Sequence, residues 1–136
     1  MQKLSTVVLC HETTHGSHYD WLLAQPRVAT AGTAVWAGRT TLHSRHWQRR
    51  KTWILHRMNP HRAYYLTYQG PVPPKDRRAR GQVRRVDRGT LMPKIWTPNR
   101  IVVAVSMRFF QATVEIHLMD SQTCYRASVV TNEPLA

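Results

Sequence analysis

Three histidines and an aspartate lie within ten residues near the start of the chain, in the segment His11-Glu12-Thr13-Thr14-His15-Gly16-Ser17-His18-Tyr19-Asp20. Imidazole and carboxylate groups bind divalent transition metals, and manganese or zinc suits this set better than calcium. The segment is therefore a candidate metal-binding site. A group of exposed histidines that contact phosphate directly is the competing interpretation.

The candidate ligands are expected at the end of one strand and the start of the next. Residues 3–10 are rich in β-branched side chains and end in an apolar run, which is typical of a buried strand. Gly16 and Ser17 predict a turn within the cluster. Residues 18–23 then resume a strand-like pattern.

Alternation along this second strand selects the side chains that can share a site. Successive side chains of a strand point to opposite faces. His18 and Asp20 therefore share one face, whereas Tyr19 and Trp21 point to the other. With His11 arriving from the preceding strand, two histidines and one carboxylate can meet at one metal ion.

Most of the remaining chain is predicted to form short strands. Strand-like patterns cover residues 30–41, 53–55, 64–68, 82–90, 101–107, 112–119 and 124–130, with an Arg-Gly turn near residue 89 and an antiparallel pair formed by 101–107 and 112–119. Residues 43–51 and 70–81 are interpreted as basic exposed loops, the second also rich in proline. No helical periodicity is sustained. We predict an all-β fold with little helix, a small closed or nearly closed antiparallel β-barrel, because closure removes strand edges.

The net charge indicates a polyanionic partner. The 136 residues contain 20 Lys and Arg against 7 Asp and Glu, a formal charge of +13. Arginine predominates, and its planar guanidinium binds phosphate through two hydrogen bonds. We therefore expect salt-sensitive binding to nucleic acid rather than to a membrane surface. A basic protein without a nucleic-acid ligand is the alternative.

Length and cysteine content limit the possible organisation of the chain. One domain over residues 1–136 is expected, with a frayed tail at 131–136. Cys10 and Cys124 are too few and too far apart for a zinc ribbon or a disulfide framework. No apolar segment approaches the roughly 20 residues of a membrane span, and no signal peptide is evident. We expect a soluble, cytoplasmic monomer.

Four segments resemble, in the same order, the 3′-phosphoesterase module at the N-terminus of bacterial DNA ligases that serve non-homologous end joining. Small stand-alone proteins of this kind also exist. The segments are the histidine-rich turn ending in His18-Tyr19-Asp20, residues 60–72 (PHRAYYLTYQGPV), residues 80–90 (RGQVRRVDRGT) and the closing pair of strands. Together they span about residues 6–119, most of the chain.

The resemblance implies a β-barrel with an active-site groove and a role in DNA repair. Members of the family are metal-dependent hydrolases that remove a 3′-phosphate, and some remove a terminal ribonucleotide, leaving a 3′-hydroxyl for a polymerase or ligase. The implied substrate is a DNA or RNA–DNA 3′ end. The implied cofactor is Mn²⁺, or alternatively Zn²⁺ or another divalent transition metal. A DNA ligase or a repair polymerase is the implied partner.

The resemblance also implies roles for particular residues. His11, His18 and Asp20 match the metal ligands, and His61 matches a histidine that contacts the scissile phosphate and is needed for catalysis. Tyr64, Tyr65 and Tyr68 in the same segment are expected either to stack on bases or, for at least two of them, to enter the core.

Two arginines flank the implied catalytic histidine. Arg57 and Arg62 are expected to face the phosphate of the substrate, unless both belong to a solvated basic surface.

Two departures from the family pattern leave alternatives open. One extra residue separates His11 from His18-Tyr19-Asp20, so either His11 or His15 is the first ligand. Leu22 stands where the ligase-linked members have an arginine. A catalytically inactive nucleic-acid-binding β-barrel is therefore the alternative function.

Overall fold

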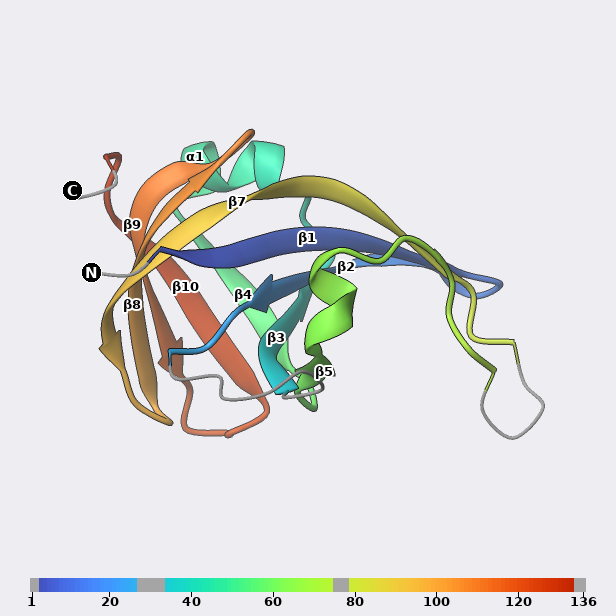
Figure 1. Cartoon of the computed structure of the whole chain (residues 1–136). Coiled ribbons are helices and arrows are strands. Elements are labelled where there is room, and N and C mark those ends of the chain that lie inside the picture. The colour runs from blue at the N-terminus through green and yellow to red at the C-terminus, as the bar shows by residue number, and fades with distance from the viewer. Residues whose placement is uncertain (1–2, 27–33, 75–78, 134–136) are drawn as a thin grey trace.

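The chain folds into a closed antiparallel β-barrel (Figure 1). The computed structural model describes residues 3–26, 34–74 and 79–133. Its strands are β1 (Leu4–Thr13), β2 (Gly16–Leu23), β3 (Ala34–Thr40), β4 (Thr52–Arg57), β5 (His61–Arg62), β6 (Gly70–Pro71), β7 (Gln82–Trp96), β8 (Arg100–Met107), β9 (Gln111–Leu118) and β10 (Cys124–Thr131). Eight of these pair in the order β1-β2-β3-β4-β10-β9-β8-β7, and β7 pairs with β1 to close the ring. The predicted fold class is confirmed.

The two short strands lie outside the ring. β5 pairs with β3, and β6 pairs with β7. β8 and β9 form the expected antiparallel pair, and β10 adds the expected last strand. Residues 30–33 of one predicted strand, 75–78 of the proline-rich loop and 134–136 of the predicted frayed tail lie outside the described residues.

Two segments differ from the prediction because they contain helical turns. Residues 43–51, predicted as an exposed loop, contain the 3₁₀ turn η1 (Ser44–His46) and the helix α1 (Trp47–Arg50). Residues 64–68, predicted as a strand, lie largely in the 3₁₀ turn η2 (Ala63–Leu66). In the described part of the chain, no helix is long and apolar enough to span a membrane.

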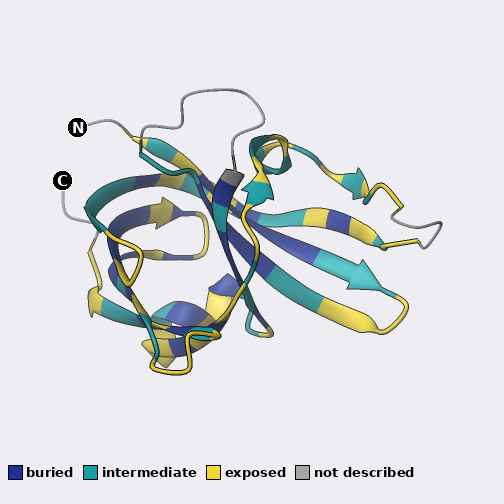
Figure 2. Cartoon of the chain, turned by 90° about the horizontal axis from the view of Figure 1, so that it is seen from below, coloured by how far each residue is buried: buried dark blue, intermediate teal, exposed yellow. Residues whose placement is uncertain are grey.

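The interior of the barrel holds the larger apolar core. Trp21 points inward from β2 and packs against Trp47, with ring centroids 4.7 Å apart, and against Phe110. Trp47 and Trp53 stack at 4.8 Å, so the aromatic side chains fill the barrel from several elements. Figure 2 shows that the buried positions lie along the strands of the barrel. The alternation predicted for Trp21 is confirmed.

A smaller apolar cluster lies on the outer face of the same wall. Val7 and Leu9 of β1 and Leu22 of β2 form this outer cluster with Val35, Ala37 and Val83. The segment 58–72, which includes η2, packs over it through Met58, Ala63, Tyr65, Leu66, Tyr68 and Val72. Both faces of β1 are therefore covered, which explains the continuous apolar run at its centre.

The tyrosines of η2 belong to this outer layer and not to the barrel core. Tyr64 and Tyr65 stack with ring centroids 4.3 Å apart, and Tyr68 lies edge-on to both. Tyr64 is exposed, whereas Tyr65 and Tyr68 are half-buried. The expectation that at least two of them enter the core as strand residues is wrong, because the 3₁₀ turn places them on the outside of the wall.

No turn interrupts β7 at Arg88-Gly89, contrary to the prediction. The strand continues through Gly89, which pairs with Met107 on β8. A Cβ atom at Gly89 would lie 1.8 Å from the carbonyl oxygen of Ser106 and 2.8 Å from Cα of Met107. Glycine is needed here because the β8 backbone approaches too closely for any side chain.

Gly89→Ala is therefore expected to lower the free energy of unfolding by at least about 2 kcal/mol, since the obstructing atoms belong to the backbone and cannot rotate away. Urea unfolding followed by circular dichroism measures the change. Thr90→Ala, at the exposed neighbouring position, is the control and should stay within about 0.5 kcal/mol of wild type. Equal effects of the two substitutions would contradict this account of Gly89.

Candidate metal centre

A tight hairpin brings His11 and His18 together. In the antiparallel pairing of β1 with β2, His11 lies opposite His18, Glu12 opposite Ser17 and Thr13 opposite Gly16. Thr14 and His15 form the turn, whereas Gly16 and Ser17, predicted as the turn, already belong to β2. Gly16 has φ +123°, a conformation that glycine adopts readily.

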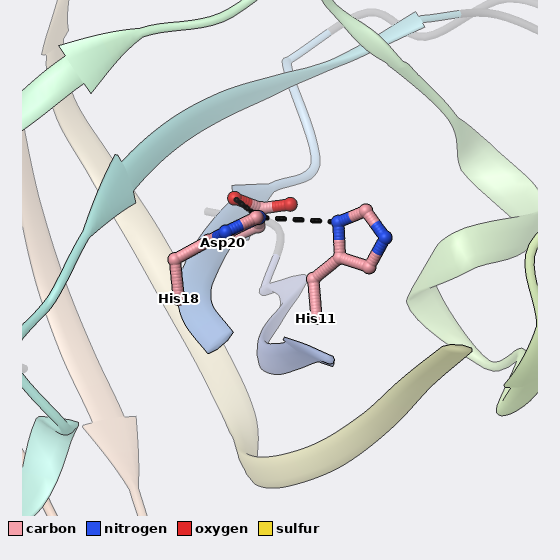
Figure 3. Close-up of side chains that lie close together, drawn as sticks. All are labelled: His11, His18 and Asp20. Atoms are coloured by element: carbon pink, nitrogen blue, oxygen red, sulfur yellow. Dashed lines mark hydrogen bonds and ion pairs between the residues drawn. The ribbon is translucent and has the colours of Figure 1, made fainter. Parts of the chain in front are cut away.

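The geometry of the hairpin determines which histidine lies in the cluster. His15 is exposed in the turn, where its backbone N–H donates to the hydroxyl of Thr13. His11, His18 and Asp20 instead place one potential ligand atom each within 4.8 Å of one another (Figure 3). His18 and Asp20 share a face of β2, as alternation predicted. The structure thus places His11 in the cluster with His18 and Asp20 and leaves His15 outside it.

The distances within the cluster suit a metal ion. Nδ1 of His11 lies 3.1 Å from Nε2 of His18, and Nε2 of His18 lies 3.9 Å from Oδ1 of Asp20. Two adjacent ligands that each bind at about 2.1 Å are separated by roughly 3 Å. The three ligand atoms lie within 4.8 Å of one another, so His11, His18 and Asp20 could hold a metal ion.

A backbone carbonyl fixes the orientation and tautomer of His11. Nε2 of His11 lies 2.6 Å from the carbonyl oxygen of Arg80, which can only accept a hydrogen bond. Nε2 therefore carries the proton, and the lone pair on Nδ1 is directed toward His18. Such a second partner on the far ring nitrogen is typical of metal-binding histidines.

The environment of His18 keeps its imidazole neutral. Partial burial lowers the pKa of His18, and the repulsion of Arg39 and His11 acts in the same direction against the attraction of Asp20. A neutral imidazole offers a lone pair to a metal ion at pH 7.

Asp20 is buried but ionised. Burial alone would raise the pKa of its carboxyl, but hydrogen bonds from His61 and Arg39 outweigh that effect and lower the pKa to about 2. Arg39 donates from Nε to Oδ1 at 2.9 Å and from Nη2 to Oδ2 at 3.3 Å. Nε2 of His61 lies 3.6 Å from Oδ2. The carboxylate is thus negatively charged at every pH at which the protein is expected to work.

The cluster lies beside a groove of about 680 Å³ on the outside of the barrel. His11 and Asp20 line the groove from β1 and β2, and His61, Arg62 and Tyr65 line it from the segment that covers the outer cluster. Arg39, Tyr64 and Arg80 complete the polar lining.

No family model matches the chain, and no curated protein is significantly similar to it.

His61 reaches the groove because residues 58–60 follow the end of β4 and lead into β5, which continues along β3 in the same direction as β4. Val35 of β3 lies opposite His61 in this short pairing. Nδ1 of His61 lies 3.1 Å from the carbonyl oxygen of Asn59, so Nδ1 carries a proton and Nε2 is directed toward Asp20. The structure thus places His61 next to Asp20, with Nε2 3.6 Å from Oδ2.

The two predicted arginines have different positions. Arg62 lines the groove, but Arg57 lies on β4 outside it, where its guanidinium donates to the carbonyl oxygen of Gln122. Arg39 and Arg80 line the groove instead and were missed. The pairing of Asp20 with Arg39 depends on the β2–β3 register, which the sequence pattern does not determine.

The groups at the groove can bind a phosphate ester, offset its negative charge and donate a proton to it. Three ligand groups can hold a cation, two or three guanidinium groups can contact phosphate oxygens, and His61 can exchange a proton. An apolar layer beneath the groove and a stacked pair of tyrosines beside it supply surfaces for a base.

Proposed function

We propose that the chain is a divalent-metal-dependent phosphoesterase that removes the 3′-phosphate from nucleic-acid ends. The observation that carries this proposal is the position of His11, His18 and Asp20, within 4.8 Å of one another at a groove that also contains His61 and arginines. The resemblance to the 3′-phosphoesterase modules supports the same assignment of these four residues. The charge of +13 supports a polyanionic substrate.

The chemistry of the side chains gives each of them a proposed role. His11, His18 and Asp20 would hold the ion, with Mn²⁺ as the first candidate and Zn²⁺ or another divalent transition metal as alternatives. A bound ion would offset phosphate charge and make a water molecule more nucleophilic. Arg62 and Arg80 at the groove contact the remaining phosphate oxygens and orient the ester for in-line attack.

His61 is the proposed proton donor. Hydrolysis forms a bond from the water oxygen to phosphorus and breaks the bond from phosphorus to the 3′-oxygen, which leaves as an alkoxide unless it receives a proton. The hydrogen bond to Asn59 fixes the ring of His61 so that Nε2 is directed toward the groove. Asp20 stabilises the protonated ring through the 3.6 Å contact, so His61 can deliver that proton.

The proposed product explains the proposed partners. Removal of a 3′-phosphate, or of a terminal ribonucleotide, leaves a 3′-hydroxyl on DNA or on an RNA–DNA end. A polymerase extends such an end and a ligase seals it, so a repair polymerase or a DNA ligase is the proposed next enzyme.

The decisive test is release of phosphate from a primer-template that ends in a 3′-phosphate. Wild-type protein is assayed with Mn²⁺, Zn²⁺, Co²⁺ and Mg²⁺ in turn and is expected to release phosphate with at least one of the transition metals. His61→Ala should lower kcat about 100-fold without weakening metal binding. Arg57→Ala is the matched control, because this residue of the adjoining strand lies outside the groove, and it should retain wild-type activity.

Two outcomes would reject the proposal. They are the absence of phosphate release by wild type with all four metals, and equal activity of His61→Ala and Arg57→Ala. The reaction product identifies the substrate further: a 3′-phosphate end yields inorganic phosphate, and a 3′-ribonucleotide end yields the shortened strand.

A nucleic-acid-binding barrel without catalytic activity is the second candidate. It is favoured by the partners that the three ligands already have: Asp20 is paired with Arg39, and Nδ1 of His11 is hydrogen-bonded to His18. A metal ion must displace the contact between the two histidines. Calorimetric titration with Mn²⁺ separates the two candidates, because the binding protein is expected to take up no metal at this site.

A further inference from the structure

A second cavity lies where the barrel wall opens between β3 and β4. The two strands pair only through Gly38 with Arg57 and Arg39 with His56. Beyond these pairs the chain leaves β3 after Thr40, and β4 continues along β10 alone. The resulting cavity has a volume of about 370 Å³.

The lining of this cavity is basic and rich in donors. Arg50, His56 and Arg126 line it together with the hydroxyls of Thr40, Thr41 and Thr52. Among its described lining residues there is no carboxylate. The guanidinium groups of Arg50 and Arg126 form no ion pair with any described residue. The charge of the cavity is therefore available to an anion from outside the chain.

The cavity is connected to the metal centre by a row of basic side chains on the outer wall. Arg39, which holds Asp20, lies opposite His56. Two residues from His56 along β4, Ile54 lies opposite Arg126 on β10, and Arg126 lies opposite His117 on β9. Because directly opposed residues point to the same face, Arg39, His56, Arg126 and His117 form one basic row across four neighbouring strands.

The row has the dimensions of a short piece of nucleic acid. Three steps between neighbouring strands, at roughly 4.8 Å each, and an offset of two residues along β4, at roughly 3.3 Å each, give about 16 Å from Arg39 to His117. A few nucleotides of a single strand occupy a similar length. The charges at the two ends are compensated, because Arg39 is paired with Asp20, and Arg100, the next residue beyond His117, is paired with Glu115, with Nε 2.5 Å from Oε2.

We propose that the basic row and its cavity bind the backbone phosphates of the nucleic-acid strand whose 3′ end lies in the groove. This inference rests on the proposed function for the direction of the strand, but binding itself needs neither the metal nor the reaction. Arg50 and Arg126 contact a phosphodiester in the cavity, and His56 lies between that phosphate and the groove. Exposed Ile54 offers an apolar contact to a sugar or base beside it.

The test uses a fluorescent single-stranded DNA with a 3′-hydroxyl, in the absence of divalent metal. The double variant Arg50→Gln/Arg126→Gln is expected to raise Kd about tenfold, and the slope of log Kd against log salt concentration should fall by about 0.7 for each lost contact. Arg49→Gln is the matched control, because Arg49 is the exposed neighbour of Arg50 in α1 and does not line the cavity. It should leave both quantities close to those of wild type.

A second measurement locates the ligand. Trp53 lines the cavity, and its indole N–H has no hydrogen-bond partner in the described part of the chain. The NMR resonance of this indole N–H is assigned by its loss in Trp53→Phe. It is expected to shift when the DNA is added to wild type and to shift much less in the double variant.

Three results would overturn the inference. The first is an equal Kd for the double variant and Arg49→Gln, and the second is an unchanged Trp53 resonance on DNA binding. The third is that the double variant weakens the binding of a poly-glutamate peptide as much as the binding of DNA, which would assign the surface to acidic proteins. None depends on phosphate release, so failure of the 3′-phosphatase assay and failure of this inference are distinguishable.

Discussion

His18→Ala is expected to remove divalent-metal binding and to lower the rate of 3′-phosphate release at least about 1,000-fold. His18 is the central member of the cluster, since its Nε2 lies 3.1 Å from His11 and 3.9 Å from Asp20. A metal ion contributes several kcal/mol of transition-state stabilisation, and about 4 kcal/mol corresponds to a factor of 1,000 in rate. Calorimetric titration with Mn²⁺ and the phosphate-release assay measure the two losses separately.

His15→Ala is the matched control for His18→Ala. His15 belongs to the same hairpin but is exposed in the turn, outside the cluster. Its replacement should leave metal affinity and kcat within about twofold of wild type. A loss of metal binding in His15→Ala comparable with that in His18→Ala would mean that the hairpin rearranges when metal binds, and would contradict the assignment of His11 as the first ligand.

Trp47→Ala is expected to lower the free energy of unfolding by about 3–5 kcal/mol. The side chain is fully buried, packs between Trp21 and Trp53, and donates from Nε1 to the carbonyl oxygen of Leu42 at 2.9 Å. The whole domain is expected to have only about 5–15 kcal/mol of stability, so this loss is a large share of it. Urea unfolding followed by circular dichroism gives the difference.

Two variants show which property of Trp47 matters. Trp47→Phe keeps an aromatic ring in the stack but loses the hydrogen bond, and it should cost about 1–2 kcal/mol. Arg49→Ala tests the helix itself at an exposed position of α1 and should cost less than about 0.5 kcal/mol. A decrease of less than about 1 kcal/mol in the free energy of unfolding of Trp47→Ala would contradict the role of Trp47 as a stabilising side chain of the barrel core.

The proximity of His11, His18 and Asp20 could be predicted from the sequence because their geometry is local. Alternation along β2 places His18 and Asp20 on one face, and a two-residue turn brings His11 opposite His18. Neither relation depends on distant parts of the chain. The position of the turn itself was predicted two residues too late, because Gly16 was taken as a turn residue and instead begins β2.

Arg39 could not be predicted because its role depends on register between strands. Asp20 meets Arg39 only when β2 and β3 pair as they do, and the connection between these strands includes residues whose pattern does not fix that pairing. Arg57 was assigned to the site because it precedes His61 in sequence by four residues. Arg57 lies on β4 and donates to the carbonyl oxygen of Gln122, whereas His61 lies on β5 at the groove, so sequence proximity was misleading.

The tyrosine-rich segment was misread for a different reason. Tyr64, Tyr65 and Tyr68 have high strand propensity, and a strand was predicted on that basis. In the structure Tyr64 stacks on Tyr65, and Tyr65 and Tyr68 pack against the outer cluster. These tertiary contacts thus outweigh local propensity.

The groove and the barrel interior are held by different sets of side chains on opposite faces of one wall. Residues 58–72 form one side of the groove and pack on the outer cluster, whereas the aromatic residues that stabilise the barrel lie behind the strands. Substitutions in this covering segment are therefore expected to change the groove while the interior keeps its packing.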